Sequence, residues 1–73
     1  MKKTKYLTLE QQSGPEHEVR RNNMTFDEAC EAHPELVSET DGSIPHPRWG
    51  HAHYIEGSSG EIRLAAENWD TSG

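Results

Sequence analysis

The chain has 73 residues, of which 13 are acidic and 7 are basic, so its formal net charge is −6 with His neutral, and 30% of its residues are hydrophobic. A chain of about this size buries roughly 60% of its unfolded surface on folding, which fits a single small domain spanning residues 1–73. The negative charge disfavours generic binding to DNA phosphates, and no apolar run approaches the roughly 20 residues of a membrane helix. The basic start Met1-Lys2-Lys3 is not followed by an apolar stretch, so we expect no secretory signal.

The charge is divided unevenly along the sequence. Residues 1–21 carry five basic and three acidic side chains, a net charge of +2, whereas residues 22–73 carry two basic and ten acidic ones, a net charge of −8. An acidic body attracts a basic partner surface over long range and raises the rate of encounter. An alternative is an acidic protein whose negative charges serve only to keep it monomeric. The single Cys30 excludes an internal disulfide.

A strand and a loop are predicted in the first third of the chain. Lys5–Leu9 contains β-favouring residues bounded by polar ones, and strand alternation places Leu7 and Leu9 on one face. Residues 11–23 show no period and contain several helix and strand breakers. This pattern predicts a mobile loop.

The clearest local signal is the start of a helix at Thr25. The Thr25 side chain can cap the first turn, while Glu28, three residues later, can reach back to the cap. Apolar residues at helical spacing continue to His33, where the following Pro34 disfavours helical geometry. So short a helix is not stable alone in water, and we expect it to pack on another element.

A hairpin is predicted near the C-terminus. Residues 34–47 are irregular and indicate a second mobile loop. Strands over Ala52–Glu56 and Glu61–Ala65 then flank Gly57–Gly60, whose glycines supply the dihedral angles that a chain reversal needs.

The register of this hairpin follows from its turn. Pairing of Glu56 with Glu61 sets Tyr54 opposite Arg63, which favours a cation–π contact. The same pairing sets His53 opposite Leu64 at the edge of an apolar face, whose members are Ile55, Ile62 and Leu64.

These elements together predict an α+β fold. A small antiparallel sheet, made of the N-terminal strand and the C-terminal hairpin, packs on one short helix and is joined by long irregular segments. A disordered tail is expected at about residues 70–73. The expected core consists of Leu7, Leu9, Phe26, Ala29, Ile55, Ile62, Leu64 and Trp69.

Five histidines and one cysteine are the residues that could carry metal or covalent chemistry. Cys30 and His33 share a helical face, and His51 and His53 share a strand face, so a zinc site is one interpretation. The spacing matches no standard zinc motif, and a helix-interior cysteine beside Ala29 is more often a small core residue than a nucleophile. We therefore expect no cofactor, no metal, no catalytic residue and no enzymatic activity.

The chemically richest segment lies just before and within the first hairpin strand. Trp, Tyr and Arg are enriched at binding hot spots, and this segment holds all three within seven positions. An alternative is that Trp49 only caps the small core. We predict a protein-contact patch made of Arg48, Trp49, His51, Tyr54 and Arg63.

Four short motifs resemble those of a widespread group of small phage proteins. They are Met24-Thr25-Phe26-Asp27-Glu28-Ala29, Arg48-Trp49, Tyr54-Ile55 and Ala66-Glu67-Asn68-Trp69, and they span roughly residues 24–70. Some longer members of that group are anti-defence proteins that sequester a nucleotide signal or inhibit a CRISPR nuclease, so the resemblance implies a role of this kind. The chain departs from the group over Pro34–Pro45, where the group has a basic strand.

In size and overall character the chain is also similar to the small transcription regulator with which a lytic Xanthomonas phage binds host RNA polymerase, inhibits initiation and causes antitermination. Both resemblances imply a phage protein that binds host machinery in the host cytoplasm. The leading expectation is a monomeric, non-enzymatic regulator that binds RNA polymerase and occludes a contact, without binding nucleic acid directly or a membrane. The alternatives are an anti-defence protein that binds a signalling nucleotide, near Trp49 and Arg63, or a CRISPR or restriction effector, and a zinc-stabilised module.

Overall fold

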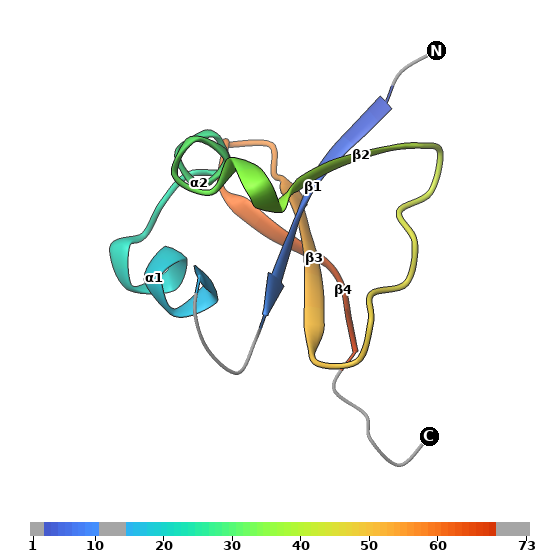
Figure 1. Cartoon of the computed structure of the whole chain (residues 1–73). Coiled ribbons are helices and arrows are strands. Elements are labelled where there is room, and N and C mark those ends of the chain that lie inside the picture. Colours follow the sequence, from blue (N-terminus) through green and yellow to red (C-terminus); the bar gives the residue numbers. More distant parts are fainter. Residues whose placement is uncertain (1–2, 11–14, 69–73) are drawn as a thin grey trace.

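The computed structural model describes residues 3–10 and 15–68. These residues form a four-stranded antiparallel sheet in the order β2-β1-β3-β4, with two short α-helices and a 3₁₀ turn, η1 (Figure 1). The expected α+β class, with an N-terminal strand and a C-terminal hairpin in one sheet, is confirmed. The elements in chain order are β1 (Lys3–Glu10), α1 (Pro15–Asn22), α2 (Phe26–Ala32), η1 (Pro34–Leu36), β2 (Val37–Asp41), β3 (His51–Glu56) and β4 (Ile62–Asn68).

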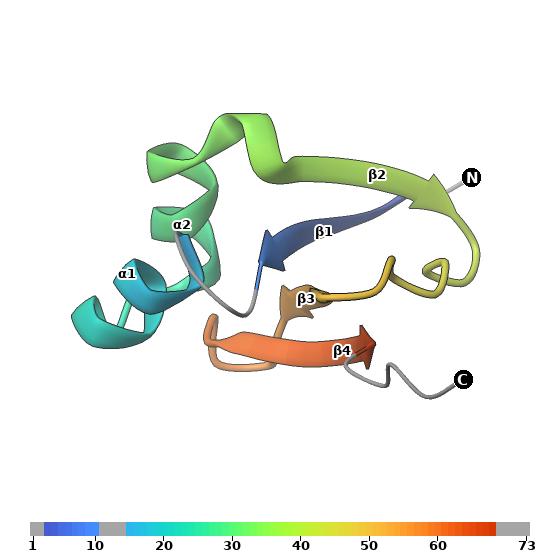
Figure 2. The same ribbon diagram turned by 60° about the horizontal axis from the view of Figure 1, so that its bottom comes forward.

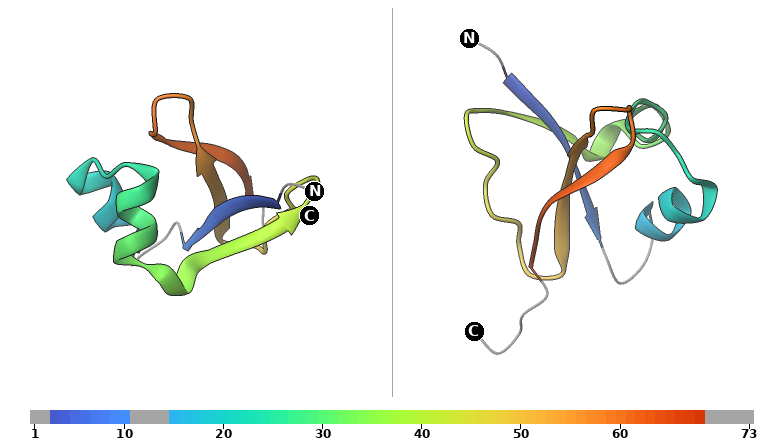
Figure 3. Two further views of the ribbon diagram at one scale, coloured as in Figure 1. Left: turned by 90° about the horizontal axis from the view of Figure 1, so that it is seen from above. Right: turned by 180° about the vertical axis from the view of Figure 1, so that it is seen from behind.

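The sheet separates the helices from the long connection between β2 and β3. Figures 1 and 3 show α1 and α2 gathered on one side of the molecule and the connection over residues 42–50 on the other. Figure 2 shows β2 and β4 at the two edges of the sheet, with β1 and β3 between them. No helix in the described part of the chain is long and apolar enough to cross a membrane.

The alternation predicted for β1 sets the centre of the core. Leu7 and Leu9 are almost completely buried, and they pair across the sheet with Tyr54 and Ala52 of β3, both of which are also buried. Side chains of directly paired residues share one face of a sheet. The apolar face of β1 therefore continues onto β3 and becomes the surface on which the helices pack.

The capping box predicted at Thr25 is confirmed. The Glu28 N–H donates to Thr25 Oγ1 at 3.2 Å, and the Thr25 N–H donates to Glu28 Oε1 at 2.9 Å. Phe26 and Ala29 are buried on the inner face of α2, and the helix ends with His33 as its C-cap, at the position that Pro34 indicated. This helix is specified locally and stabilised by the sheet.

The loop predicted over residues 11–23 is wrong for its described part, because Pro15–Asn22 forms α1. Its single aliphatic residue, Val19, is buried in the core, and Glu16, one turn earlier, is buried beside it. Eight residues with one apolar side chain lack a helical stripe of their own. The helix forms because the sheet supplies the contacts that the local sequence does not.

The loop predicted over residues 34–47 is also wrong in part. Residues 34–36 form η1 and residues 37–41 form β2, which pairs with β1. The pairing sets Asp41 opposite Lys3 and Glu39 opposite Lys5, so opposite charges face each other across the strands. β2 is held by these charge pairs and by main-chain hydrogen bonds, and it lacks the alternation of apolar residues by which a strand is predicted from sequence.

The hairpin is confirmed, but its register differs from the prediction by one residue as far as Tyr54, and by a second residue beyond a β-bulge between Tyr54 and His53. Glu56 pairs with Ile62, Ile55 with Arg63, and Tyr54 with Leu64. The cause is the turn: the Gly57 N–H donates to the Glu61 carbonyl at 2.8 Å, and Gly60 has φ +82°, the left-handed position of a three-residue loop. Gly57 thus still belongs to the ladder.

The shifted register corrects the expected core. Ile55 and Ile62 are only half-buried, and Leu64 is 44% exposed. The expected Tyr54–Arg63 contact is wrong, because these residues are not opposite each other. The expected burial of Leu7, Leu9, Phe26 and Ala29 is confirmed. Trp69 and the tail at 70–73 lie outside the described residues.

Candidate functional site

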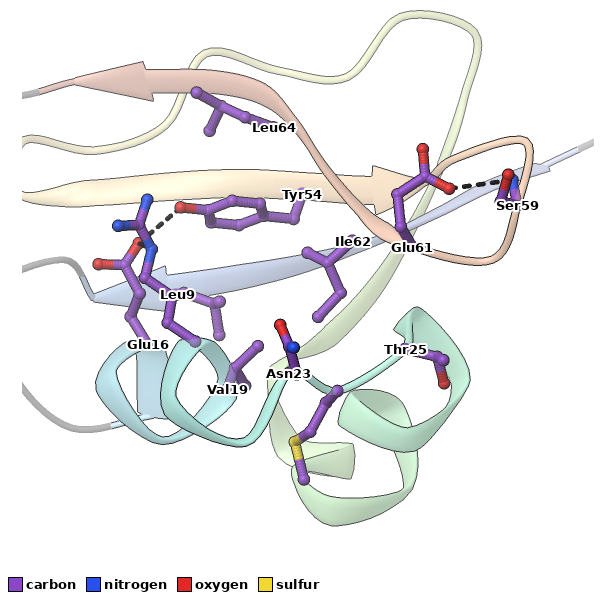
Figure 4. Close-up of a pocket in the computed structure, with 12 residues that line it drawn as sticks. Leu9, Glu16, Val19, Asn23, Thr25, Tyr54, Ser59, Glu61, Ile62 and Leu64 are labelled. Carbon is purple, nitrogen blue, oxygen red and sulfur yellow. Dashed lines mark hydrogen bonds and ion pairs between the residues drawn. The ribbon is translucent and has the colours of Figure 1, made fainter.

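An open groove of about 640 Å³ lies between α1 and the β3–β4 hairpin (Figure 4). Two carboxylates, Glu16 and Glu61, and one guanidinium, Arg20, are the charged groups that line it. Its apolar lining consists of Leu9, Val19, Met24, Tyr54, Ile62 and Leu64. A concave, mostly apolar surface with a few charged groups is typical of a binding site.

The groove exists because α1 and α2 leave part of the sheet uncovered. The Phe26 N–H donates to the Gly60 carbonyl at 2.9 Å, which joins the start of α2 to the hairpin turn. Val19 holds α1 against the core. Between these two points the helices do not cover Leu64, which is the more exposed of the two β4 aliphatic side chains in the groove.

A buried carboxylate lies at one end of the groove. The Tyr54 hydroxyl donates to Glu16 Oε2 at 2.5 Å, and Arg20 Nε lies 4.0 Å from the same oxygen. Glu16 is 7% exposed. Burial, and next the hydrogen bond and the charge of Glu16, raise the pKa of Tyr54 to about 12. The phenol therefore stays protonated and remains a donor to Glu16 throughout the neutral range.

The sequence-predicted contact residues do not form one patch. Arg48 and Trp49 are exposed and His51 is half-buried, and all three lie at the start of β3, where the Gly50 N–H donates to the Asn68 carbonyl at 2.7 Å. Tyr54 lies on the helix side of the sheet, in the groove. Arg63 is exposed and pairs with Ile55 near the hairpin turn.

This placement bears on the nucleotide alternative. A pocket shared by Trp49 and Arg63 would need the two side chains close together. Arg63 lies next to the turn, whereas Trp49 precedes the His51–Asn68 pair at the far end of the same hairpin. The structure thus places the two residues at opposite ends of the hairpin.

The residues considered for zinc do not converge. His53 is buried on the other face of β3, where its Nδ1 lies 3.1 Å from Thr8 Oγ1 and its ring lies 4.7 Å from the Tyr6 ring. His33 lies between Glu18 and Glu35, 3.7 Å and 3.9 Å away. In the described part of the chain no group of three or more His, Cys, Asp or Glu residues could hold a metal ion.

Two pKa shifts describe what these side chains can do chemically. Burial raises the pKa of the Cys30 thiol; the charge of Lys5 opposes this effect, and Asp27 and Glu56 add to it, so the thiolate that nucleophilic chemistry needs is disfavoured. Burial lowers the pKa of His53, with smaller contributions from His51 and His46, so its ring is held neutral beside Thr8 and Tyr6.

The groove itself was missed by sequence reasoning, because its α1 wall was expected to be a loop. One signal was present. Pro15 is followed by Glu16 and Glu18 in the first turn and by Arg20 and Arg21 in the last turn. Proline at the first helical position and this order of charges both suit a helix and its dipole.

No family of known proteins, no curated protein and no solved structure matches this chain.

Proposed function

We propose that this protein is a non-enzymatic phage regulator that binds a host protein complex, RNA polymerase above all, and acts by occluding a contact that the complex needs. The single observation that carries the proposal is the groove between α1 and the hairpin, with Leu64 exposed on its wall and carboxylates among its lining. Apolar anchors surrounded by charged groups are the arrangement by which protein partners are held and oriented.

The charge distribution supports a partner with a basic surface. Residues 22–73, which contain all of α2, β2, β3 and β4, have a net charge of −8. Polymerases and other proteins that handle nucleic acid present basic surfaces, and opposite charge raises the rate of association. Binding of this kind would operate in the host cytoplasm, with the regulator as a monomer and without direct contact to nucleic acid or membrane.

The polymerase proposal is tested with the immobilised protein. Purified bacterial RNA polymerase, as core enzyme and as holoenzyme, is passed over it at low and at high salt, and run-off transcription is measured in parallel. We expect retention that weakens as salt rises, because the attraction between charged surfaces is screened, together with reduced initiation. Recovery of no polymerase subunit from either purified enzyme or host lysate would contradict the proposal.

A further inference from the structure

The face of the sheet that points away from the helices carries a small packed layer of its own. Tyr6 of β1 and His53 of β3 are 8% and 7% exposed, and their ring centroids lie 4.7 Å apart. His53 Nδ1 lies 3.1 Å from Thr8 Oγ1. Among the described residues, the main buried apolar cluster includes neither ring. The layer can therefore be exposed while the core between the sheet and the helices stays packed.

The connection over residues 42–50 covers this layer. It lies on the side of the sheet opposite the two α-helices (Figures 1 and 3), and its residues Pro47 and Gly50 are buried. Burial, and next the charges of His51 and His46, lower the pKa of His53. Because water and salt screen charges that are far apart, this effect places His46 of the connection close to the His53 ring.

Asn68, the last residue of β4, anchors the connection at two points. Its side-chain amide donates to the Pro47 carbonyl at 3.2 Å, and its own carbonyl accepts the Gly50 N–H at 2.7 Å. Residues 42–46 lie in bends and irregular backbone rather than in a strand. Segments outside a hydrogen-bonded ladder open locally at a lower free energy than the strands beside them. We therefore expect the connection to open before the sheet does.

The residues directly opposite His53 offer no charge to a protonated ring. They are Thr8 on β1 and Ala66 on β4. The other ionisable groups that the strand register and the connection bring to this face are Glu10, opposite His51, Arg63, opposite Ile55, and His46 and Arg48 of the connection. The carboxylate of Glu10 is exposed and lies across from a different histidine. A proton on His53 thus enters a site whose direct neighbours carry no negative charge.

We propose that the connection over residues 42–50 is an acid-opened cover, which lies closed over Tyr6 and His53 at neutral pH and opens when His53 takes up a proton. A buried positive charge without a paired carboxylate is costly, and access to water removes that cost. Protonation of histidine in this way drives other pH-dependent rearrangements of proteins.

Opening of the cover also changes a surface used for recognition. Arg48 and Trp49 are exposed residues of the same connection, and both belong to the contact patch predicted from the sequence. When the connection moves, these side chains move with it. The device operates whichever partner the protein binds, so it does not rest on the proposed function.

Amide hydrogen exchange of the ¹⁵N-labelled full chain, measured as the pH is lowered, tests the cover. The reporter is the Gly50 amide, whose hydrogen bond to Asn68 holds the connection closed. After correction for the intrinsic pH dependence of exchange, opening at Gly50 should increase below a pH of about 6.5, by up to about tenfold per pH unit, because one proton is taken up. The ladder amides of β1 and β3 should stay protected at a pH at which Gly50 has opened.

Three variants assign the effect to the cover. His53→Gln should make the opening at Gly50 independent of pH, whereas His17→Gln, which removes an exposed histidine of α1, should leave the rise unchanged. Asn68→Ala removes the donor to the Pro47 carbonyl and should increase opening about two- to tenfold at every pH. Amide spectra at neutral pH check that each variant is folded.

The ring signals of His53 in the wild-type protein give a second measurement, which decides the question even if His53→Gln does not fold. They should titrate over the same pH range in which Gly50 opens. Protection of Gly50 that does not change with pH, or an equal rise in folded His53→Gln, would overturn the proposal. So would ring titration without opening, or ladder amides that lose protection together with Gly50, because the latter would show unfolding of the whole domain.

Discussion

The hydrogen bond between Tyr54 and Glu16 makes a sharp prediction about stability. Tyr54→Phe removes the hydroxyl and leaves a carboxylate that is only 7% exposed without its 2.5 Å donor. Hydrogen bonds to charged groups contribute about 1.5–3 kcal/mol, and a buried acceptor left alone costs the full desolvation penalty. Arg20 still lies 4.0 Å from Glu16, so we expect a loss of about 2 kcal/mol, or about 8–16 °C in Tm for a domain of this size.

Urea unfolding at neutral pH measures this loss. The matched control is Tyr6→Phe, because Tyr6 is also buried but its hydroxyl forms no hydrogen bond with the described residues. The control should change the free energy of unfolding by no more than about 0.5 kcal/mol. If Tyr54→Phe and Tyr6→Phe destabilise equally, the hydrogen bond does not hold α1 to the sheet and the reasoning fails.

The same pair predicts a loss of stability at alkaline pH. The pKa of Tyr54 is raised to about 12 in the fold, against about 10 for an exposed tyrosine. The folded state therefore holds the phenolic proton more tightly than the unfolded state, and the resulting stability is complete below pH of about 10 and lost as the pH rises toward 12. A shift of this size corresponds to about 3 kcal/mol. Tyr54→Phe should lack this fall in urea melts across the window.

Three further predictions test the fold. Thr25→Ala removes the acceptor of the Glu28 N–H and should lower the free energy of unfolding by about 1 kcal/mol in urea melts; no change would mean that the cap is not formed in solution. Leu64 is 44% exposed and Leu7 is fully buried. Leu64→Ser should therefore change the free energy of unfolding by at most about 0.5 kcal/mol, whereas Leu7→Ala should lower it by about 2–5 kcal/mol. Equal losses for the two variants would place Leu64 in the core. Burial lowers the pKa of His53, so the stability that it contributes is complete above pH of about 6.5 and lost as the pH falls below that value. His53→Gln should flatten the acid limb of stability against pH, and a His53 ring signal that titrates at the ordinary value would contradict this reasoning.

Elements with a complete local signal were predicted correctly. The helix at Thr25 is specified by a side chain and a main-chain group three residues apart, and the strand around Leu7 by alternation over five residues. The hairpin was found from its glycines, but its register was not, because one left-handed glycine, Gly60, decides whether Gly57 lies in the turn or in the ladder. A one-residue slip exchanges the faces of the side chains that follow, and in this hairpin it does so as far as Leu64, beyond which the β-bulge shifts the register by a second residue.

The candidate site shows the same division. Tyr54 was expected to contribute to binding and does lie in the groove, whereas Arg48 and Trp49 lie at the far end of the hairpin. Glu16 was overlooked because its helix has one apolar residue and no periodic stripe. A groove formed by two walls could not be predicted while one wall was expected to be a loop.

The sequence by itself determined the acidic balance, the capped helix and the alternating first strand, because each depends on residues close together in the chain. Only the tertiary structure decided that residues 15–22 are helical, that residues 37–41 add an edge strand, and that Leu64 is exposed beside a groove. The interactions responsible join distant positions, as Tyr54 and Glu16 do across 38 residues. These interactions stabilise the protein only when the sheet brings the partners together, so no local sequence pattern predicts them.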